Sequence, residues 1–157
     1  MLYLVHHGEA VGPEVDPMRP LSDRGRAEID LLAQSAAARG VMPAVIWHSG
    51  KLRARQTAEI LLEELNRPCE IVTTANLTPY APVEDLWREL REYAPLSPVV
   101  VVGHNPQLSE FVSTLIGSPR YAVEMKKAAI AYVKDTGAGP APAGRLTWML
   151  TAKLAEV

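Results

Sequence analysis

The chain has 157 residues, of which 48% are hydrophobic, and we expect it to form one domain over residues 1–157. Its net charge of -2 and the absence of a concentrated basic patch argue against nucleic-acid binding. The single cysteine, Cys69, excludes an intrachain disulfide and a cysteine-built metal cluster. No signal-like or membrane-length apolar segment is found, so we expect a cytoplasmic protein without membrane attachment.

The first two thirds of the chain alternate between short apolar runs and amphipathic stretches. The apolar runs, which predict buried strands, are Leu2 to His6, Ala44 to His48, Glu70 to Thr74 and Val99 to Gly103. The stretches that predict helices are Ser22 to about Arg39, Lys51 to Leu65, Val83 to about Tyr93, and Pro106 to Ile116. This alternation predicts a single-domain α/β fold with three layers, α/β/α, and a mostly parallel central sheet.

The last third has a different pattern. Ala128 to Val133 and Leu146 to Leu150 predict two further strands. The segment between them, residues 136–144, is rich in glycine and proline. We expect it to be an exposed and mobile hairpin loop.

All four histidines follow or end predicted strands. His6 and His7 close the first strand, His48 closes the second, and His104 follows the strand that ends at Gly103. Ligands of open α/β sheets bind outside the carboxyl ends of the strands. We therefore expect the four imidazoles to converge on one crevice.

The neighbouring residues suit a phosphoryl group. Gly8 allows a close backbone approach to a ligand, and Ser49 is expected to cap the helix that carries Arg53 and Arg55. A helix N-terminus beside a guanidinium binds a dianion through oriented N–H groups and a bidentate fork. The sequence Gly103-His104-Asn105-Pro106 opens a second such helix. Together these features predict a phosphate pocket.

The ordered motifs HHGEA, RPLS, SGKLRARQTAEIL and VVVVGHNPQL resemble the histidine phosphatase (phosphoglycerate mutase-like) superfamily, and in particular its SixA-type phosphohistidine phosphatases. The resemblance covers nearly the whole chain. It implies that His7 is the nucleophile, that Arg53 binds phosphate and that His104 assists. It also implies a phosphate-binding environment formed by His6, Gly8, Arg19 and Asn105, while Glu9 and His48 are possible assisting residues.

The sequence departs from the family at His6, where the family motif has arginine. An imidazole offers at most two donors in place of five and is charged only when protonated. Loss of a bidentate contact should cost roughly 2–4 kcal/mol of transition-state stabilisation. We therefore expect either an enzyme weakened at neutral pH or one with an acidic optimum, with an imidazolium at His6 partly compensating.

The resemblance implies in-line transfer of the phosphoryl group to His7 and hydrolysis of the phosphohistidine formed there, without a metal or other cofactor. Family members that cleave phosphate esters place an acid in a segment that here, at residues 76–82, contains none. This favours a phosphohistidine substrate, for example in a signalling protein, because its N–P bond needs little acid assistance. A small-molecule phosphomonoesterase remains the alternative, and the oligomeric state is open.

Several other readings compete. An inactive phosphate-binding module and a zinc or nickel protein are both possible, although His6 and His7 are expected to point to opposite faces of their strand. His48 suits pocket lining and core packing equally. Arg55 is expected to pair with Glu59 at helical i,i+4 spacing, which leaves Arg53 as the phosphate ligand.

Overall fold

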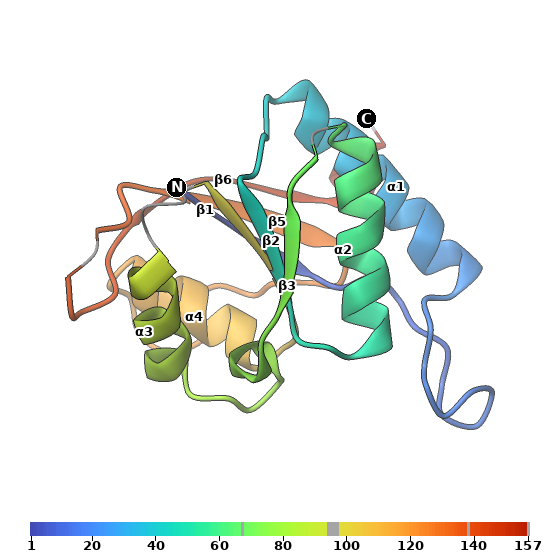
Figure 1. Cartoon of the computed structure of the whole chain (residues 1–157), viewed down its shortest axis with the longest axis horizontal. Coiled ribbons are helices and arrows are strands. Elements are labelled where there is room, and N and C mark those ends of the chain that lie inside the picture. Colours follow the sequence, from blue (N-terminus) through green and yellow to red (C-terminus); the bar gives the residue numbers. More distant parts are fainter. Residues whose placement is uncertain (67, 94–97, 138, 157) are drawn as a thin grey trace.

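The computed structural model describes residues 1–66, 68–93, 98–137 and 139–156, and a six-stranded mixed sheet forms its centre (Figure 1). The strands are β1 (Leu2–His6), β2 (Val45–His48), β3 (Glu70–Thr73), β4 (Val99–Gly103), β5 (Ala129–Lys134) and β6 (Arg145–Thr151). Their order is β3-β2-β4-β1-β5-β6, with the first four parallel. Strand β5 runs antiparallel to β1, and β6 antiparallel to β5. The predicted mostly parallel sheet is confirmed.

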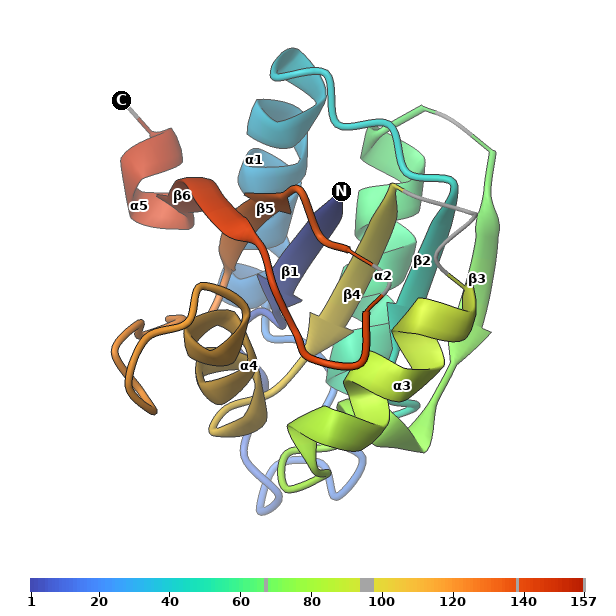
Figure 2. The ribbon, with the colours of Figure 1, turned by 90° about the vertical axis from the view of Figure 1, so that its left-hand side faces the viewer.

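Helices cover both faces of this sheet, as predicted (Figures 1 and 2). The helices are α1 (Asp23–Ala38), α2 (Leu52–Glu64), η1 (Ala75–Leu77), α3 (Val83–Tyr93), α4 (Gln107–Leu115) and α5 (Ala152–Ala155). Helices α1 and α2 lie on one face, and α3 and α4 on the other. Helices η1 and α5 could not be predicted from the sequence, because each is too short to show a helical period.

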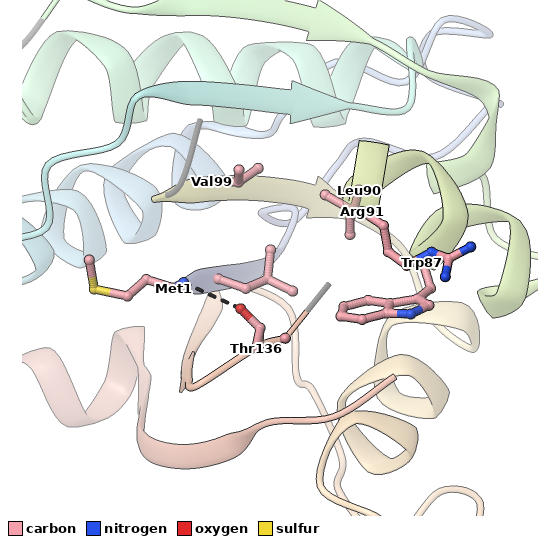
Figure 3. A pocket seen from close by; sticks show the side chains of 8 residues that line it. Met1, Trp87, Leu90, Arg91, Val99 and Thr136 are labelled. Carbon is pink, nitrogen blue, oxygen red and sulfur yellow. Dashed lines mark hydrogen bonds between the residues drawn. The ribbon is translucent and has the colours of Figure 1, made fainter. Parts of the chain in front are cut away.

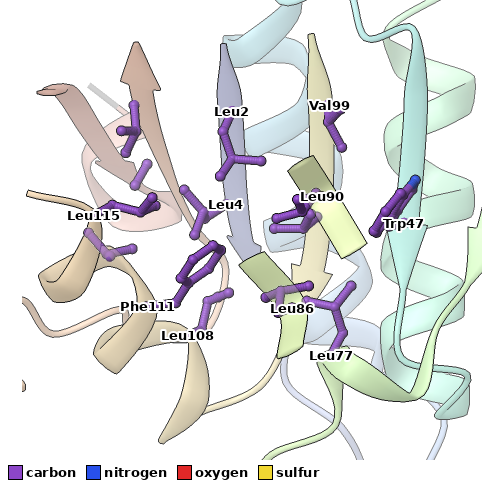
Figure 4. Packing of buried hydrophobic residues seen from close by; sticks show 14 of the residues in the cluster. Leu2, Leu4, Trp47, Leu77, Leu86, Leu90, Val99, Leu108, Phe111 and Leu115 are labelled. Carbon is purple, nitrogen blue, oxygen red and sulfur yellow. The ribbon is translucent and has the colours of Figure 1, made fainter. Parts of the chain in front are cut away.

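The sheet separates two hydrophobic clusters. On the side of α3 and α4, Leu86 and Phe111 pack against Leu4 and Trp47 of the sheet (Figure 4). The second cluster joins α1 and α2 to the opposite sheet face. All five residues of β1 and of β4 are buried, which explains why these strands read as continuous apolar runs.

Two predicted helix starts need correction. Ser49 does not cap α2: the N-cap is Lys51, without a side-chain hydrogen bond, and Ser49 Oγ accepts the Lys51 N–H at 3.3 Å. The Ser49 hydroxyl is instead committed to His104. Pro106 is the N-cap of α4, not its first helical residue. Ser22, in contrast, caps α1 by accepting the Gly25 N–H at 3.0 Å.

The connection between β5 and β6 is largely exposed, as expected, although Ala138 lies outside the described residues. The indole N–H of Trp87 donates to the Gly139 carbonyl at 3.0 Å and so ties this connection to α3. Its mobility stays a prediction. None of the helices in the described ranges has the length and apolar character that crossing a membrane requires.

Candidate active site

Strand register brings three of the four histidines together. His6 is level with Gly103 of β4, and the next residues, His7 and His104, continue from these strand ends. The ring centroids of His6 and His7 are 4.7 Å apart, and those of His7 and His104 are 4.8 Å apart. All three rings are buried. A compact imidazole cluster therefore stands at the carboxyl ends of β1 and β4.

His48 does not show a contact with this cluster among the described residues. Its Nδ1 accepts the Gly50 N–H at 3.0 Å, and its Nε2 lies 3.4 Å from the Thr73 hydroxyl. Burial and then the charge of Arg55 lower its pKa. These contacts are those of a packed side chain at the β2 and β3 ends. The nearby pair between Arg55 and Glu59, at 3.3 Å, is as predicted.

The hydrogen bonds of His7 determine which of its nitrogens is available. Nδ1 lies 2.6 Å from the Gly8 carbonyl, and because a carbonyl only accepts, Nδ1 carries the proton. Nε2 is left with its lone pair, toward which Arg53 directs its Nε–H at 3.4 Å. Burial, followed by the neighbouring His6 ring, lowers the pKa of His7 to about 2. His7 is therefore a neutral imidazole whose Nε2 is unprotonated.

Gly8 is held where no larger residue fits. A Cβ there would lie 2.8 Å from Cγ1 of Ile29 and 3.0 Å from the Gly25 carbonyl. The Gly8 N–H donates to the Thr57 hydroxyl at 3.2 Å, and that hydroxyl donates to the Arg53 carbonyl at 2.8 Å. Thr57 thus fixes the distance between the His7 loop and the helix that carries Arg53. Sequence reasoning missed it, although its position one turn after Arg53 was an available signal.

His104 is oriented by Ser49. Its Nε2 lies 2.6 Å from the Ser49 hydroxyl, whereas its Nδ1 is buried without a hydrogen-bond partner in the described part of the chain. Burial and then the Arg53 charge lower the pKa of His104 to about 3. Since the Ser49 hydroxyl can donate to Nε2, the ring can carry its own proton on Nδ1. In that tautomer the Nδ1–H of His104 is a donor without a partner among the described residues, in a ring whose centroid lies 4.8 Å from that of His7.

Two arginines give the site its positive charge. Arg53 is half-buried, and burial followed by the charge of Arg19 lowers its pKa. Arg19 donates its Nε–H to the Val11 carbonyl at 3.1 Å, within the loop before α1. That loop is anchored to α2, because Gln56 Oε1 accepts the Leu21 N–H at 2.7 Å.

The remaining predicted residues are engaged in scaffolding contacts. Glu9 accepts the Ser22 hydroxyl at 2.9 Å and lies 4.0 Å from Arg24. Asn105 donates its Nδ2–H to the Met125 carbonyl at 2.7 Å, and His6 donates its Nδ1–H to the same carbonyl at 2.8 Å. None of these hydrogen bonds is with His7.

The prediction that the side chains of His6 and His7 point to opposite faces of their strand is wrong. Strand β1 ends at His6, so the side chain of His7 does not follow the alternating directions of the strand residues. The His7 ring contacts the His6 ring edge-on. Within the described ranges, no three His, Cys, Asp or Glu side chains are grouped as a metal site would need.

A separate cavity of about 80 Å³ lies at the other ends of the strands (Figure 3). Leu2 and Val99, which begin β1 and β4, line it together with Trp87 and Leu90 of α3. The N-terminal amine donates to the Thr136 hydroxyl at its edge, at 3.3 Å. Since the histidines stand at the carboxyl ends, this cavity is remote from them.

Comparisons with known proteins identify the family of the chain. Residues 2–100 match the model of the histidine phosphatase superfamily, branch 1. An uncharacterized protein of Picosynechococcus is 34% identical over 143 residues, 87% of this chain and 86% of that protein. The mitochondrial serine/threonine-protein phosphatase Pgam5 of Drosophila ananassae is 31% identical over 70% of this chain, which spans only 35% of that protein.

Solved structures place the fold in the same group. The protein histidine phosphatase SixA complexed with tungstate is 25% identical, with a TM-score of 0.86 and 97% of each chain covered. A putative alpha-ribazole-5'-P phosphatase of Escherichia coli is 18% identical, with a TM-score of 0.75 and 96% of each chain covered, and shares the fold. The chain belongs to the histidine phosphatase superfamily, branch 1, and its structure resembles those of the SixA phosphohistidine phosphatases.

Proposed function

We propose that this protein hydrolyses phosphohistidine in a protein substrate, through a phosphohistidine intermediate on His7. The observation that carries the proposal is the bond between His7 Nδ1–H and the Gly8 carbonyl, because it leaves the Nε2 lone pair beside Arg53. A nucleophile must be unprotonated and positioned, and this contact provides both.

In the first step, His7 Nε2 attacks phosphorus, an N–P bond forms and the bond to the leaving group breaks. The guanidinium groups of Arg53 and Arg19 and the Gly8 loop would hold the phosphoryl oxygens, together with His104 Nδ1–H and the helix N-terminus after Asn105. A substrate phosphohistidine that is protonated on its other ring nitrogen leaves as neutral imidazole, so no strong acid is required. This agrees with the absence of an acid in residues 76–82.

In the second step, water attacks phosphorus and the N–P bond of His7 breaks. With Nδ1 still protonated against the Gly8 carbonyl, phosphorylated His7 is an imidazolium and leaves as the neutral ring. The proton released by the attacking water goes to the phosphate product or to solvent. The Gly8 carbonyl thus supports both halves of the reaction, and the scheme needs no proton relay through His7.

The experiment that tests the proposal compares three substrates: a phosphohistidine peptide, a phosphoserine peptide and an aryl phosphate. The proposal predicts turnover of the phosphohistidine peptide, with loss of activity in His7→Ala. Preference for the esters would point to a phosphomonoesterase instead. Binding of orthophosphate without turnover of any of the three would identify a phosphate-binding module.

A further inference from the structure

His6 is buried at 6% exposure and has already used its hydrogen-bond donor. Its Nδ1 lies 2.8 Å from the Met125 carbonyl, which only accepts, so the ring proton is on Nδ1. Burial lowers its pKa, and the neutral ring has no second N–H to offer. Unlike the arginine that the family motif carries at this position, neutral His6 therefore cannot donate to a phosphoryl oxygen.

The Met125 carbonyl is the centre of a set of hydrogen bonds that holds residues 123–128 in place, and we call this set the clamp. It also accepts the Asn105 Nδ2–H at 2.7 Å, and the Met125 N–H donates to the Ser109 hydroxyl at 2.9 Å. The Ala128 N–H donates to the carbonyls of His6 and His7, at 3.1 and 3.2 Å. Met125 itself is fully buried. The segment is thus fixed against α4 on one side and the end of β1 on the other.

Lys126 and Lys127 lie between these anchors, and both are exposed. They line a groove of about 600 Å³ that also includes Arg24, Glu28, Lys153 and Glu156. The carboxylate of Glu28 is held by Arg24 at 2.7 Å. The groove therefore has more cations than anions. Its Lys127 is followed directly by Ala128, the residue whose N–H is bonded to the His6 and His7 carbonyls.

We infer that His6 is a positioning residue: it clamps residues 123–128 so that Lys126 and Lys127 stand beside the reaction site and bind acidic side chains around the phosphorylated residue of a protein substrate. The inference rests on the proposed function. Charge complementarity carries it, since a chain of net charge -2 here presents a local cationic groove, and two of its lysines belong to the segment that is bonded to the His6 and His7 carbonyls. The occupant is an acidic protein surface.

The test uses His6→Asn and His6→Leu as a matched pair, because the Asn amide can replace the Nδ1–H donor and Leu cannot. Amide hydrogen exchange of Met125 and Ala128 should accelerate about tenfold in His6→Leu and stay near wild type in His6→Asn. This measurement does not depend on catalysis.

Substrate binding is followed with a Glu-rich phosphohistidine peptide and a Lys-rich peptide of the same length. We expect His6→Leu and Lys126→Ala/Lys127→Ala each to raise KM for the acidic peptide about fivefold, and the combined variant to add little. Neither change should raise KM for the basic peptide. The Kd of orthophosphate should stay within about twofold of wild type in His6→Leu, because the clamp does not touch the phosphoryl group.

Other outcomes overturn the inference. If His6→Leu weakens orthophosphate binding about tenfold and His6→Gln restores it, His6 is a phosphate ligand through Nε2. Equal KM for the acidic peptide in wild type and the lysine variant would remove the docking role. If wild type turns over neither peptide, the proposed function fails, and the Kd of the acidic peptide for each variant then decides the inference.

Discussion

The buried imidazoles make stability depend on pH in a specific direction. The pKa of His7 is lowered to about 2 and that of His104 to about 3, whereas both rings titrate near 6.5 in the unfolded chain. Below about pH 6.5 both rings bind protons in the unfolded chain but not in the native state, so acid favours unfolding. At about pH 5, the free energy of unfolding is therefore lower than at neutral pH by about 2 kcal/mol for each ring, or about 4 kcal/mol for the pair.

Urea denaturation at about pH 7.5 and about pH 5 measures this loss. In His7→Asn and His104→Gln, which cannot be protonated in this range, the loss between the two pH values should shrink by about 2 kcal/mol each. Lys153→Gln, an exposed change, is the control and should leave the pH dependence as in wild type. Identical pH dependence in wild type and both histidine variants would refute the assignment of neutral, buried rings.

Three further substitutions test the contacts that build the site. Gly25→Ala would bring a Cβ within 2.0 Å of the Glu9 carbonyl oxygen. Despite the higher helix propensity of alanine, it should therefore destabilise the native state by more than about 2 kcal/mol, as measured by thermal unfolding. Gln34→Ala, on the exposed face of α1, is its control. Thr57→Val leaves the buried Gly8 N–H without its acceptor and should cost about 1–3 kcal/mol in urea denaturation. Arg53→Lys keeps the charge but loses the fork, and kcat should fall about 100-fold with the phosphohistidine peptide; an unchanged kcat would exclude Arg53 from the reaction.

Much of the fold could be predicted because its signals are local. The buried parallel strands read as apolar runs, and the helices between them have a clear period and defined ends. The meeting of His7 with His104 followed from topology, since residues after neighbouring parallel strands share one edge of the sheet. Arg53 was placed there by the same reasoning, at the start of the helix after β2.

The contacts that orient these side chains could not be predicted. His6 forms a hydrogen bond with the carbonyl of Met125, 119 residues away, and no sequence pattern predicts such a bond. Serine is a favoured residue type at helix N-caps, yet the Ser49 hydroxyl binds His104 instead, because the tertiary structure places an imidazole nearby. His48 ends a strand as His6 does, but its contacts are with Gly50 and Thr73.

The central claim is that His7 accepts the phosphoryl group at Nε2. The most direct measurement is rapid quenching after mixing with a phosphohistidine peptide, followed by mass spectrometry of the chain under alkaline conditions that preserve phosphohistidine. We expect one acid-labile phosphoryl group on His7, absent in His7→Ala. A phosphoryl group on another residue, or turnover that persists in His7→Ala, would contradict it.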